Sequence, residues 1–338
     1  MSSVSLIREP AWSGLAPGLP QTVPAEPAEA ALLLRLLGLS GRLSGLRFAG
    51  AASGHYKLVT VDGEALHLKV VEPSRRSSVE RAEAIAEWLA RKGLAVATPS
   101  AGFPRTLPDG RLVTCCPYIE GRRIAPKPAD LAALGRSVAL LHAALASHPD
   151  RNHWVRSTRC RLDALTEIGR ELAAGRLSCG PDHELLRALA SDEALRFDLP
   201  DAATPLHGDL NPGNVLVAQS TDRPVLLDFE DVFHSVLPPM FELLLVIERF
   251  VFVQTEDDKR ALRLARAFLD GYCSDGASIP TKDAPSTMLR ALSLRSLCVL
   301  AQGAREGVGV APLEWKKFFY LERQARRRAG VLNQVFAT

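Results

Sequence analysis

The chain has 338 residues, 47% of them hydrophobic and 23% charged, and its formal net charge is +3 at pH 7. This length and composition suffice to bury a full hydrophobic core, as one large domain or two modest ones. The cysteines have neither zinc-ligand nor redox-motif spacing, which excludes a recognisable site of either kind and favours reduced thiols in the cytoplasm.

The first forty residues are predicted to hold an irregular arm and one helix. Residues 1–24 are rich in Pro, Gly and Ser and lack the basic flank and apolar core of an export signal. A helix is predicted from Pro27 to Leu37. We therefore expect residues 1–40 to form an arm and helix that precede the first domain.

Residues 41–118 have the pattern of a small antiparallel sheet. The segment 48–61, the Asp62-Gly63 turn and the apolar segment 65–71 together predict a β-meander whose second turn is a hairpin. Its first turn lies between Gly50 and Gly54.

A helix and a further strand follow the meander. Apolar residues recur on one face of segment 78–92, which predicts an amphipathic helix. The segment 111–121 follows an Asp109-Gly110 turn and predicts the last strand of a five-stranded sheet.

The remainder, residues 119–338, is predicted to be mostly helical. His142 lies beside the apolar face of the first of these helices and is expected to be a core residue. None of the helices is expected to cross a membrane, and the basic residues near the C-terminus are interpreted as a solvated helix face, because no nucleic-acid-binding motif accompanies them. The predicted helices are residues 129–147, 162–174, 182–190, 240–253, 257–272, 284–303 and 313–331.

The most informative stretch runs from His207 to Asn214 and reads His-Gly-Asp-Leu-Asn-Pro-Gly-Asn. Asp209 precedes Asn214 by five residues, and Asp228 follows fourteen residues later at the end of a short apolar segment. Protein kinases place an Asp base, an Asn metal ligand and a second metal-binding Asp in this order. An Asn-Pro-Gly turn alone is common in globular proteins, but the full order and spacing favour a phosphoryl-transfer site.

The chemistry of that transfer explains these residue types. Asp209 would orient an acceptor hydroxyl and take its proton. Magnesium prefers hard oxygen ligands and keeps several waters, so the amide oxygen of Asn214, the carboxylate of Asp228 and triphosphate oxygens are sufficient to hold it.

The motif His-Gly-Asp, with Asn five residues after the Asp and a later Asp-Phe-Glu, resembles the aminoglycoside phosphotransferase and choline kinase-like family of small-molecule kinases. Protein kinases usually carry Arg where Gly208 stands and Gly where Glu230 stands. The resemblance covers about residues 46–329. It implies an α+β, bilobal, protein-kinase-like fold, with a small antiparallel β-sheet lobe over residues 41–118 and a larger, mostly helical lobe over residues 119–338.

The resemblance also implies a nucleotide site between the lobes. Lys69, at the end of an apolar strand, would pair with the α- and β-phosphates. The carbonyl of Pro117 and the amide of Ile119 would face the purine. Ser53, in the turn that would cover the phosphates, is a candidate phosphate contact.

One glutamate of the helix 78–92 would hold the lysine. Glu83 fits this position best, and Glu80 and Glu87 lie one turn to either side. His207 is expected to be architectural and to bond the backbone near the Asp228 turn. Glu242 is expected to complement the N-terminus of its own helix.

The implied activity is transfer of the γ-phosphoryl group of ATP or GTP, with Mg²⁺, to a hydroxyl of a small molecule such as an aminoglycoside or other antibiotic, an amino alcohol, a sugar or homoserine. A protein Ser/Thr kinase and a nucleotide-binding pseudokinase are the alternatives. A polycationic acceptor needs an acidic pocket. The acids that follow Asp228 in the sequence could supply such a pocket. The net charge of the chain does not decide whether they do.

Overall fold

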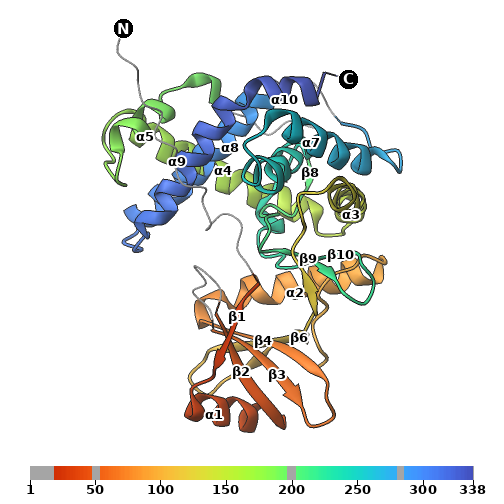
Figure 1. Ribbon diagram of the computed structural model, residues 1–338. Helices are drawn as coiled ribbons and strands as arrows, with labels where there is room; N and C mark the ends of the chain where they lie inside the picture. The colour runs from red at the N-terminus through yellow and green to blue at the C-terminus, as the bar shows by residue number, and fades with distance from the viewer. Residues whose placement is uncertain (1–18, 48–53, 196–202, 280–284, 338) are drawn as a thin grey trace.

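The computed structural model describes residues 19–47, 54–195, 203–279 and 285–337, which form two stacked lobes (Figure 1). The small lobe is built on a six-stranded antiparallel sheet in the order β1-β2-β3-β4-β6-β5. Its strands are β1 (Gln21–Pro24), β2 (Gly41–Arg47), β3 (Gly54–Thr60), β4 (Ala65–Val71), β5 (Arg105–Thr106) and β6 (Leu112–Pro117).

The first forty residues differ from the prediction in a strand and agree with it in the helix that follows. Residues 21–24 are not an irregular arm but a strand that pairs with β2, so the sheet has six strands and not five. Helix α1 (Pro27–Leu37) has the predicted bounds, because Pro27 opens it and Gly38, at φ 64°, ends it. Its residues Leu33 and Leu37 pack into the apolar cluster of the sheet. The segment is therefore part of the small lobe.

Helix α2 (Arg76–Arg91) lies between the sheet and the larger lobe (Figure 1). It follows the 3₁₀ turn η1 (Pro73–Arg75). Ile85 and Leu89 on its apolar face join the core cluster of the large lobe. This helix therefore positions the two lobes relative to each other.

The large lobe is mainly helical, as predicted, with two differences in its helix bounds. Helix α4 begins at Arg151, well before residue 162, because Trp154 and Thr158 in its first turns are buried. The predicted helix 313–331 is divided at Arg328, whose buried guanidinium donates to the carbonyl of Thr255 at 2.7 Å. The helices are α3 (Pro128–Ala146), α4 (Arg151–Ala173), α5 (His183–Ala190), α6 (Pro239–Val246), α7 (Asp258–Cys273), α8 (Pro285–Arg305), α9 (Pro312–Arg327) and α10 (Ala329–Val335), with a π-helical segment η4 (Ile247–Phe252) and a 3₁₀ turn η2 (Glu193–Leu195).

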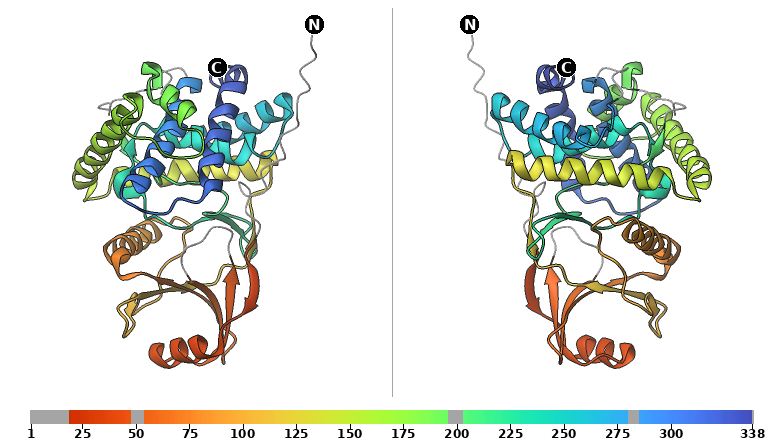
Figure 2. Two further views of the ribbon diagram at one scale, coloured as in Figure 1. Left: turned by 90° about the vertical axis from the view of Figure 1, so that its left-hand side faces the viewer. Right: turned by 90° about the vertical axis from the view of Figure 1, so that its right-hand side faces the viewer.

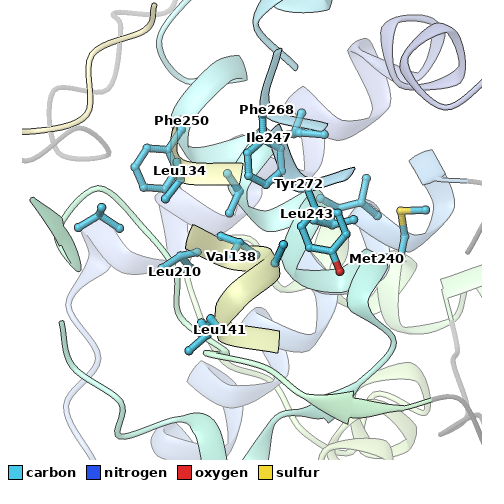
Figure 3. Close-up of a cluster of buried hydrophobic side chains, with 14 of the residues drawn as sticks. Leu134, Val138, Leu141, Leu210, Met240, Leu243, Ile247, Phe250, Phe268 and Tyr272 are labelled. Carbon is cyan, nitrogen blue, oxygen red and sulfur yellow. The ribbon is translucent and has the colours of Figure 1, made fainter. Parts of the chain in front are cut away.

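The core of the large lobe forms where α3, α6, η4 and α7 meet, and Figure 3 shows Leu134 and Val138 of α3 beside Leu243 and Phe268. Within the described ranges, α3 is the one helix whose length and apolar composition would allow it to cross a membrane. Its apolar side chains are packed against α7 in this core.

A two-stranded and a three-stranded sheet carry the Asp209 segment. β8 (Thr204–Pro205) pairs with β11 (Val236–Leu237), and β9 (Val215–Ala218) pairs with β10 (Pro224–Leu226) and β7 (Gly121–Arg122). The β9–β10 hairpin lies at the edge of the large lobe that faces the small lobe (Figure 2). Residues 207–214 between β8 and β9, called here the Asp209 loop, are therefore held at the junction of the lobes.

Candidate active site

The Asp209 loop is anchored by a buried carboxylate on α6. Glu242 accepts hydrogen bonds from the backbone amides of His207, at 3.1 Å, and Gly208, at 2.8 Å. His142 Nε2 lies 2.8 Å from the same carboxylate. Glu242 lies in the first turn of α6, where its charge was expected to complement the helix N-terminus, and its bonds to the Asp209 loop were not expected.

Glu242 is fully enclosed, with 1% of its surface exposed. Burial opposes its ionisation, but the hydrogen bond and charge of His142 and the amide of Gly208 outweigh burial and hold the pKa of Glu242 below its ordinary value. Tyr272 completes this polar group, 3.1 Å from His142 Nδ1. His142 is thus a core residue, as expected, with the added role of orienting Glu242.

His207 connects the Asp209 loop to the Asp228 turn. Its Nε2 donates to the carbonyl of Leu227 at 2.9 Å, which is the architectural contact expected of it. Gly208 has φ 86°, and a Cβ at this position would overlap the side chain of Ser235. A glycine is therefore needed where protein kinases carry Arg.

Asp209 and Asn214 are in direct contact. Asn214 Nδ2 donates to the backbone carbonyl of Asp209 at 2.9 Å and to its Oδ2 at 3.2 Å. Asn211 Oδ1 accepts from the amide of Gly213 at 2.7 Å and closes the intervening turn. Burial raises the pKa of the Asp209 carboxyl above its ordinary value, the charge of Asp231 acts in the same direction, and the charge of Arg249 opposes it.

Lys69 has partners other than the predicted one. Its Nζ lies 2.9 Å from Glu230 Oε1 and 3.5 Å from Asp228 Oδ2. Burial favours the neutral amine, but the negative charges of Asp228 and Glu230 outweigh it and raise the pKa of Lys69. Glu230 also binds Arg75, and Ser78 Oγ donates to it at 3.1 Å. These groups at the start of α2 hold Glu230 where it captures the lysine.

The predicted pair of Lys69 with Glu83 is therefore not formed. Oε2 of Glu83 is buried without a hydrogen-bond partner. Burial, together with the charges of Glu87 and Glu80, raises the pKa of Glu83 to about 7. Glu83 remains inside the same cavity as Lys69.

That cavity has a volume of about 1050 Å³ and lies between the lobes. It brings together all but one of the predicted site residues, and Ser53 lies outside the described residues. The predicted residues that line it are Lys69, Glu83, Pro117, Ile119, Asp209, Asn214 and Asp228.

Two histidines at the small-lobe side of the cavity were missed by the sequence reasoning. His55 Nδ1 and His67 Nε2 are 3.1 Å apart, and the two rings are stacked. Burial and the charge of Lys69 lower the pKa of His55 to about 4, and burial, His55 and Lys69 lower that of His67 to about 3. The available signal was strand alternation, since His67 lies two residues before Lys69 on the same face of β4.

A family model described as the phosphotransferase enzyme family matches residues 44–278. The chain belongs to this family. The family match and the fold confirm the resemblance predicted from the Asp209 motif and the α+β, protein-kinase-like architecture. No curated protein sequence matches the chain.

Solved structures of similar fold include several small-molecule kinases. An amicoumacin kinase in complex with AMP-PNP and Ca²⁺ has a TM-score of 0.63 and 16% identity, and the match covers 91% of this chain and 97% of that one. A choline kinase from Streptococcus pneumoniae has a TM-score of 0.60 and 14% identity, with 89% and 100% covered. A macrolide 2'-phosphotransferase from Brachybacterium faecium has a TM-score of 0.57 and 20% identity, with 85% and 98% covered.

The large-lobe side of the phosphotransferase cavity was also missed by the sequence reasoning. Beside Asp209 the cavity is lined by Arg249 of η4 and by Lys317 and Phe318 of α9. These elements are far apart in the sequence, and no motif marks them. They form the part of the cavity that faces away from the small lobe.

The donor set for a metal ion fits magnesium bound with a nucleotide. Asn214 and Asp228 supply one amide oxygen and one carboxylate to the cavity. No group of three or more His, Cys, Asp or Glu residues in the described ranges could hold a metal ion by itself. Mg²⁺ binds through one or two protein oxygens plus phosphates, so this donor set agrees with a metal that arrives with the nucleotide.

Proposed function

We propose that this phosphotransferase moves the γ-phosphoryl group of ATP or GTP to a hydroxyl of a small molecule. The observation that carries the proposal is the arrangement around one cavity: Asp209 is hydrogen-bonded to Asn214, and Lys69 lies 3.5 Å from Asp228. This is the set of base, metal ligands and phosphate-binding cation that phosphoryl transfer requires.

In the proposed step the acceptor oxygen forms a bond to the γ-phosphorus while the bond to the β–γ bridging oxygen breaks. The nucleoside diphosphate leaves with the electron pair, and the hydroxyl proton passes to Asp209. The hydrogen bond from Asn214 Nδ2 to Asp209 Oδ2 would hold the carboxylate in place to take that proton. Mg²⁺ held by Asn214 and Asp228 would neutralise charge on the phosphates.

The nucleotide would occupy the small-lobe side of the cavity. The α- and β-phosphates would replace Glu230 as the partners of Lys69. Glu83 would then be the carboxylate of α2 that lies near the lysine. The backbone of Pro117 and Ile119 would face the purine. Ser53, which precedes β3 in the sequence, is the proposed contact to the phosphates.

We also place the enzyme in the cytoplasm. All six cysteines are free, and reduced thiols are typical of that compartment.

A protein Ser/Thr kinase and a pseudokinase are less well supported. Only residues 229–238 separate Asp228 from α6, which is too short for an activation segment that presents a peptide. The pseudokinase alternative is disfavoured because Asp209, Asn214 and Asp228, the proposed base and metal ligands, all line one cavity.

The test is Mg²⁺-dependent release of ADP or GDP across a panel of amino alcohols, sugars, homoserine and aminoglycosides. Asp209→Asn is the matched variant, because it keeps the shape of the side chain and removes the base. We expect turnover that depends on one acceptor class and falls at least about a hundredfold in the variant. Absence of nucleotide binding would contradict the proposal, and nucleotide binding without turnover on any acceptor would favour the pseudokinase.

A further inference from the structure

The acids that follow Asp228 in the sequence do not form an acidic pocket. Asp231 pairs with Arg161, 3.1 Å from its Nη1. Glu230 is held by Lys69 and Arg75, as described above. Each carboxylate therefore already has a cationic partner.

Three further acids of this stretch also have partners. Glu242 is enclosed beneath the Asp209 loop. Asp257 accepts from the amide of Arg260 at 2.8 Å and caps α7, and Asp258 pairs with Arg328. A polycationic acceptor would find no free carboxylate among these residues.

The guanidinium of Arg249, by contrast, lies beside Asp209, and its hydrogen-bond donors are only partly satisfied. Its Nε lies 3.0 Å from Oε2 of Glu248, but the geometry is not that of a hydrogen bond. Arg249 Nε and Glu248 Oε1 are both buried without a hydrogen-bond partner. A buried Nε–H donor without an acceptor is unfavourable unless an acceptor group completes it.

The backbone at Arg249 has an unusual conformation. Residues Ile247–Phe252 form a π-helix, a conformation that is rare and occurs mostly at functional sites. Ile247 and Phe250 are buried in the core on either side of it. The extra residue in the turn brings Arg249 to the cavity wall while the apolar residues keep their packing.

The surroundings of Arg249 contain an aromatic ring and charges of both signs. Its guanidinium carbon lies 5.5 Å from the ring centre of Phe318, and Lys317 Nζ lies 4.7 Å from the same ring. Glu314, the acid on this wall, pairs with Lys317. Arg249 is therefore ion-paired with Glu248, while its Nε still lacks a hydrogen-bonded acceptor.

From this geometry we propose that the acceptor carries an anionic group, a carboxylate or a phosphate, which binds to Arg249 while its hydroxyl lies at Asp209. This inference rests on the phosphotransfer proposed above and names the substrate class of that site. The planar guanidinium fork matches a carboxylate or phosphate in a bidentate arrangement, and Phe318 packs against the carbon skeleton.

The experiment uses sets of compounds that share a skeleton and differ in charge, in the presence of AMP-PNP and Mg²⁺. One set is gluconate, glucose 6-phosphate, glucose and glucosamine; a second is glycerate, glycerol 3-phosphate, glycerol and 3-aminopropane-1,2-diol. Choline and kanamycin represent cationic acceptors. Binding is followed by calorimetry with AMP-PNP, and turnover is followed by release of ADP with ATP in place of AMP-PNP.

We expect anionic members to bind or turn over, with Arg249→Gln weakening Kd or KM for them about tenfold to a hundredfold and leaving AMP-PNP affinity unchanged. Arg249→Lys should restore part of the loss. Lys317→Glu reverses a charge at the cavity rim without altering η4. It tests whether positive charge on this wall favours binding of the anions. Arg305→Gln is the matched control, because Arg305 pairs with Glu171 outside the cavity. Preference for glycerate and gluconate over the phosphate esters identifies a carboxylate, and the reverse identifies a phosphate.

Three outcomes overturn the inference. One is turnover of choline, kanamycin or a neutral polyol in preference to the anions. Another is an equal response of wild type and Arg249→Gln to the anions, and the third is no response to any anion at millimolar concentration. Failure of the phosphotransfer proposal has a different signature, because AMP-PNP would then fail to bind while anion binding to Arg249 could still be measured without nucleotide.

Discussion

Lys69 Nζ lies 2.9 Å from Oε1 of Glu230, so a residue of the large lobe holds the lysine of β4. Arg75 and Ser78 bind the other oxygen of the same carboxylate. Burial opposes ionisation of Glu230, but the charges and hydrogen bonds of Lys69 and Arg75 outweigh it and lower the pKa of Glu230. One carboxylate therefore joins β4, η1 and α2 to the Asp228 turn.

Glu230→Gln is expected to lower the free energy of unfolding by about 1–3 kcal/mol, because Lys69 and Arg75 lose a shared anionic partner in a partly buried site. Phosphates can replace that partner for Lys69. AMP-PNP with Mg²⁺ should therefore raise the Tm of the variant by more than it raises the Tm of wild type. Thermal melts with and without nucleotide measure this difference.

Glu314→Gln is the control for Glu230→Gln, because Glu314 is more exposed and pairs with a lysine outside the phosphate region. It should leave the nucleotide-dependent Tm shift unchanged. Equal shifts in wild type and Glu230→Gln would show that Lys69 does not exchange Glu230 for phosphate.

Replacement of Glu83 is predicted to stabilise the protein, whereas replacement of Glu230 is predicted to destabilise it. Its pKa is raised to about 7, mainly by burial and then by Glu87 and Glu80. This carboxyl is harder to ionise in the folded state than in the unfolded state. The free energy of unfolding is therefore highest below the ordinary pKa of the carboxyl and falls as pH rises from there to about 7. Ionised Glu83 should therefore destabilise the protein by about 1–2 kcal/mol above pH 7, discounted for its partial exposure.

Glu83→Gln removes that ionisation and keeps the shape of the side chain. The variant should melt above wild type at about pH 8 and together with it at about pH 4. Glu80→Gln is the control, because Glu80 lies in the same helix but is exposed and paired with Arg76. Its Tm relative to wild type should not depend on pH in this way. A wild-type advantage at both pH values would indicate that Glu83 is stabilised by a partner.

Glu242→Gln should reduce activity through the Asp209 loop. The amide nitrogen of Gln cannot accept a hydrogen bond, so one of the two amides of His207 and Gly208 loses its partner in a buried site. We expect kcat to fall about tenfold or more with little change in the KM for nucleotide, and the free energy of unfolding to fall by about 2–4 kcal/mol.

Glu242→Asp keeps the charge and is the matched variant for this position. Its kcat should lie between those of wild type and Glu242→Gln. Steady-state kinetics with an identified acceptor, together with urea unfolding, distinguish loop positioning from a general loss of stability. Unchanged kcat in a destabilised Glu242→Gln would show that the loop does not depend on this anchor.

Local parts of the site could be predicted from the sequence, because their partners are close in the chain. Asp209 and Asn214 are five residues apart and form a direct hydrogen bond, and the caps of α1 fix its bounds. Lys69 and Glu230 are 161 residues apart. The helix pattern offered three nearer glutamates, and only the folded arrangement of Arg75 and Ser78 selects Glu230.

Other features carry no periodic signal at all. Arg249 reaches the cavity because η4 is a π-helix, and its sequence resembles that of any apolar helix with two charges. Residues 21–24 become a strand because an edge of β2 is available to them. Tertiary context decides both cases.

The crossing of α3 and α7 depends on two glycines that let the helix backbones touch. A Cβ on Gly135 would overlap the carbonyl of Phe268, and a Cβ on Gly271 would overlap that of Ala132. Backbone carbonyls cannot rotate away as side chains do. Gly135→Ala should therefore separate the helices and destabilise the protein by about 2–4 kcal/mol, although Ala is the better helix former.

Gly169 in α4 is the matched control, because a Cβ there meets nothing within 4 Å. Gly169→Ala should be neutral or stabilise the protein by up to about 1 kcal/mol, since only helix propensity changes. Urea unfolding of both variants measures the two effects with opposite signs. Because α3 carries His142 and α6 carries Glu242, Gly135→Ala should also reduce kcat. Stability equal to wild type in Gly135→Ala would show that the close helix crossing is not required.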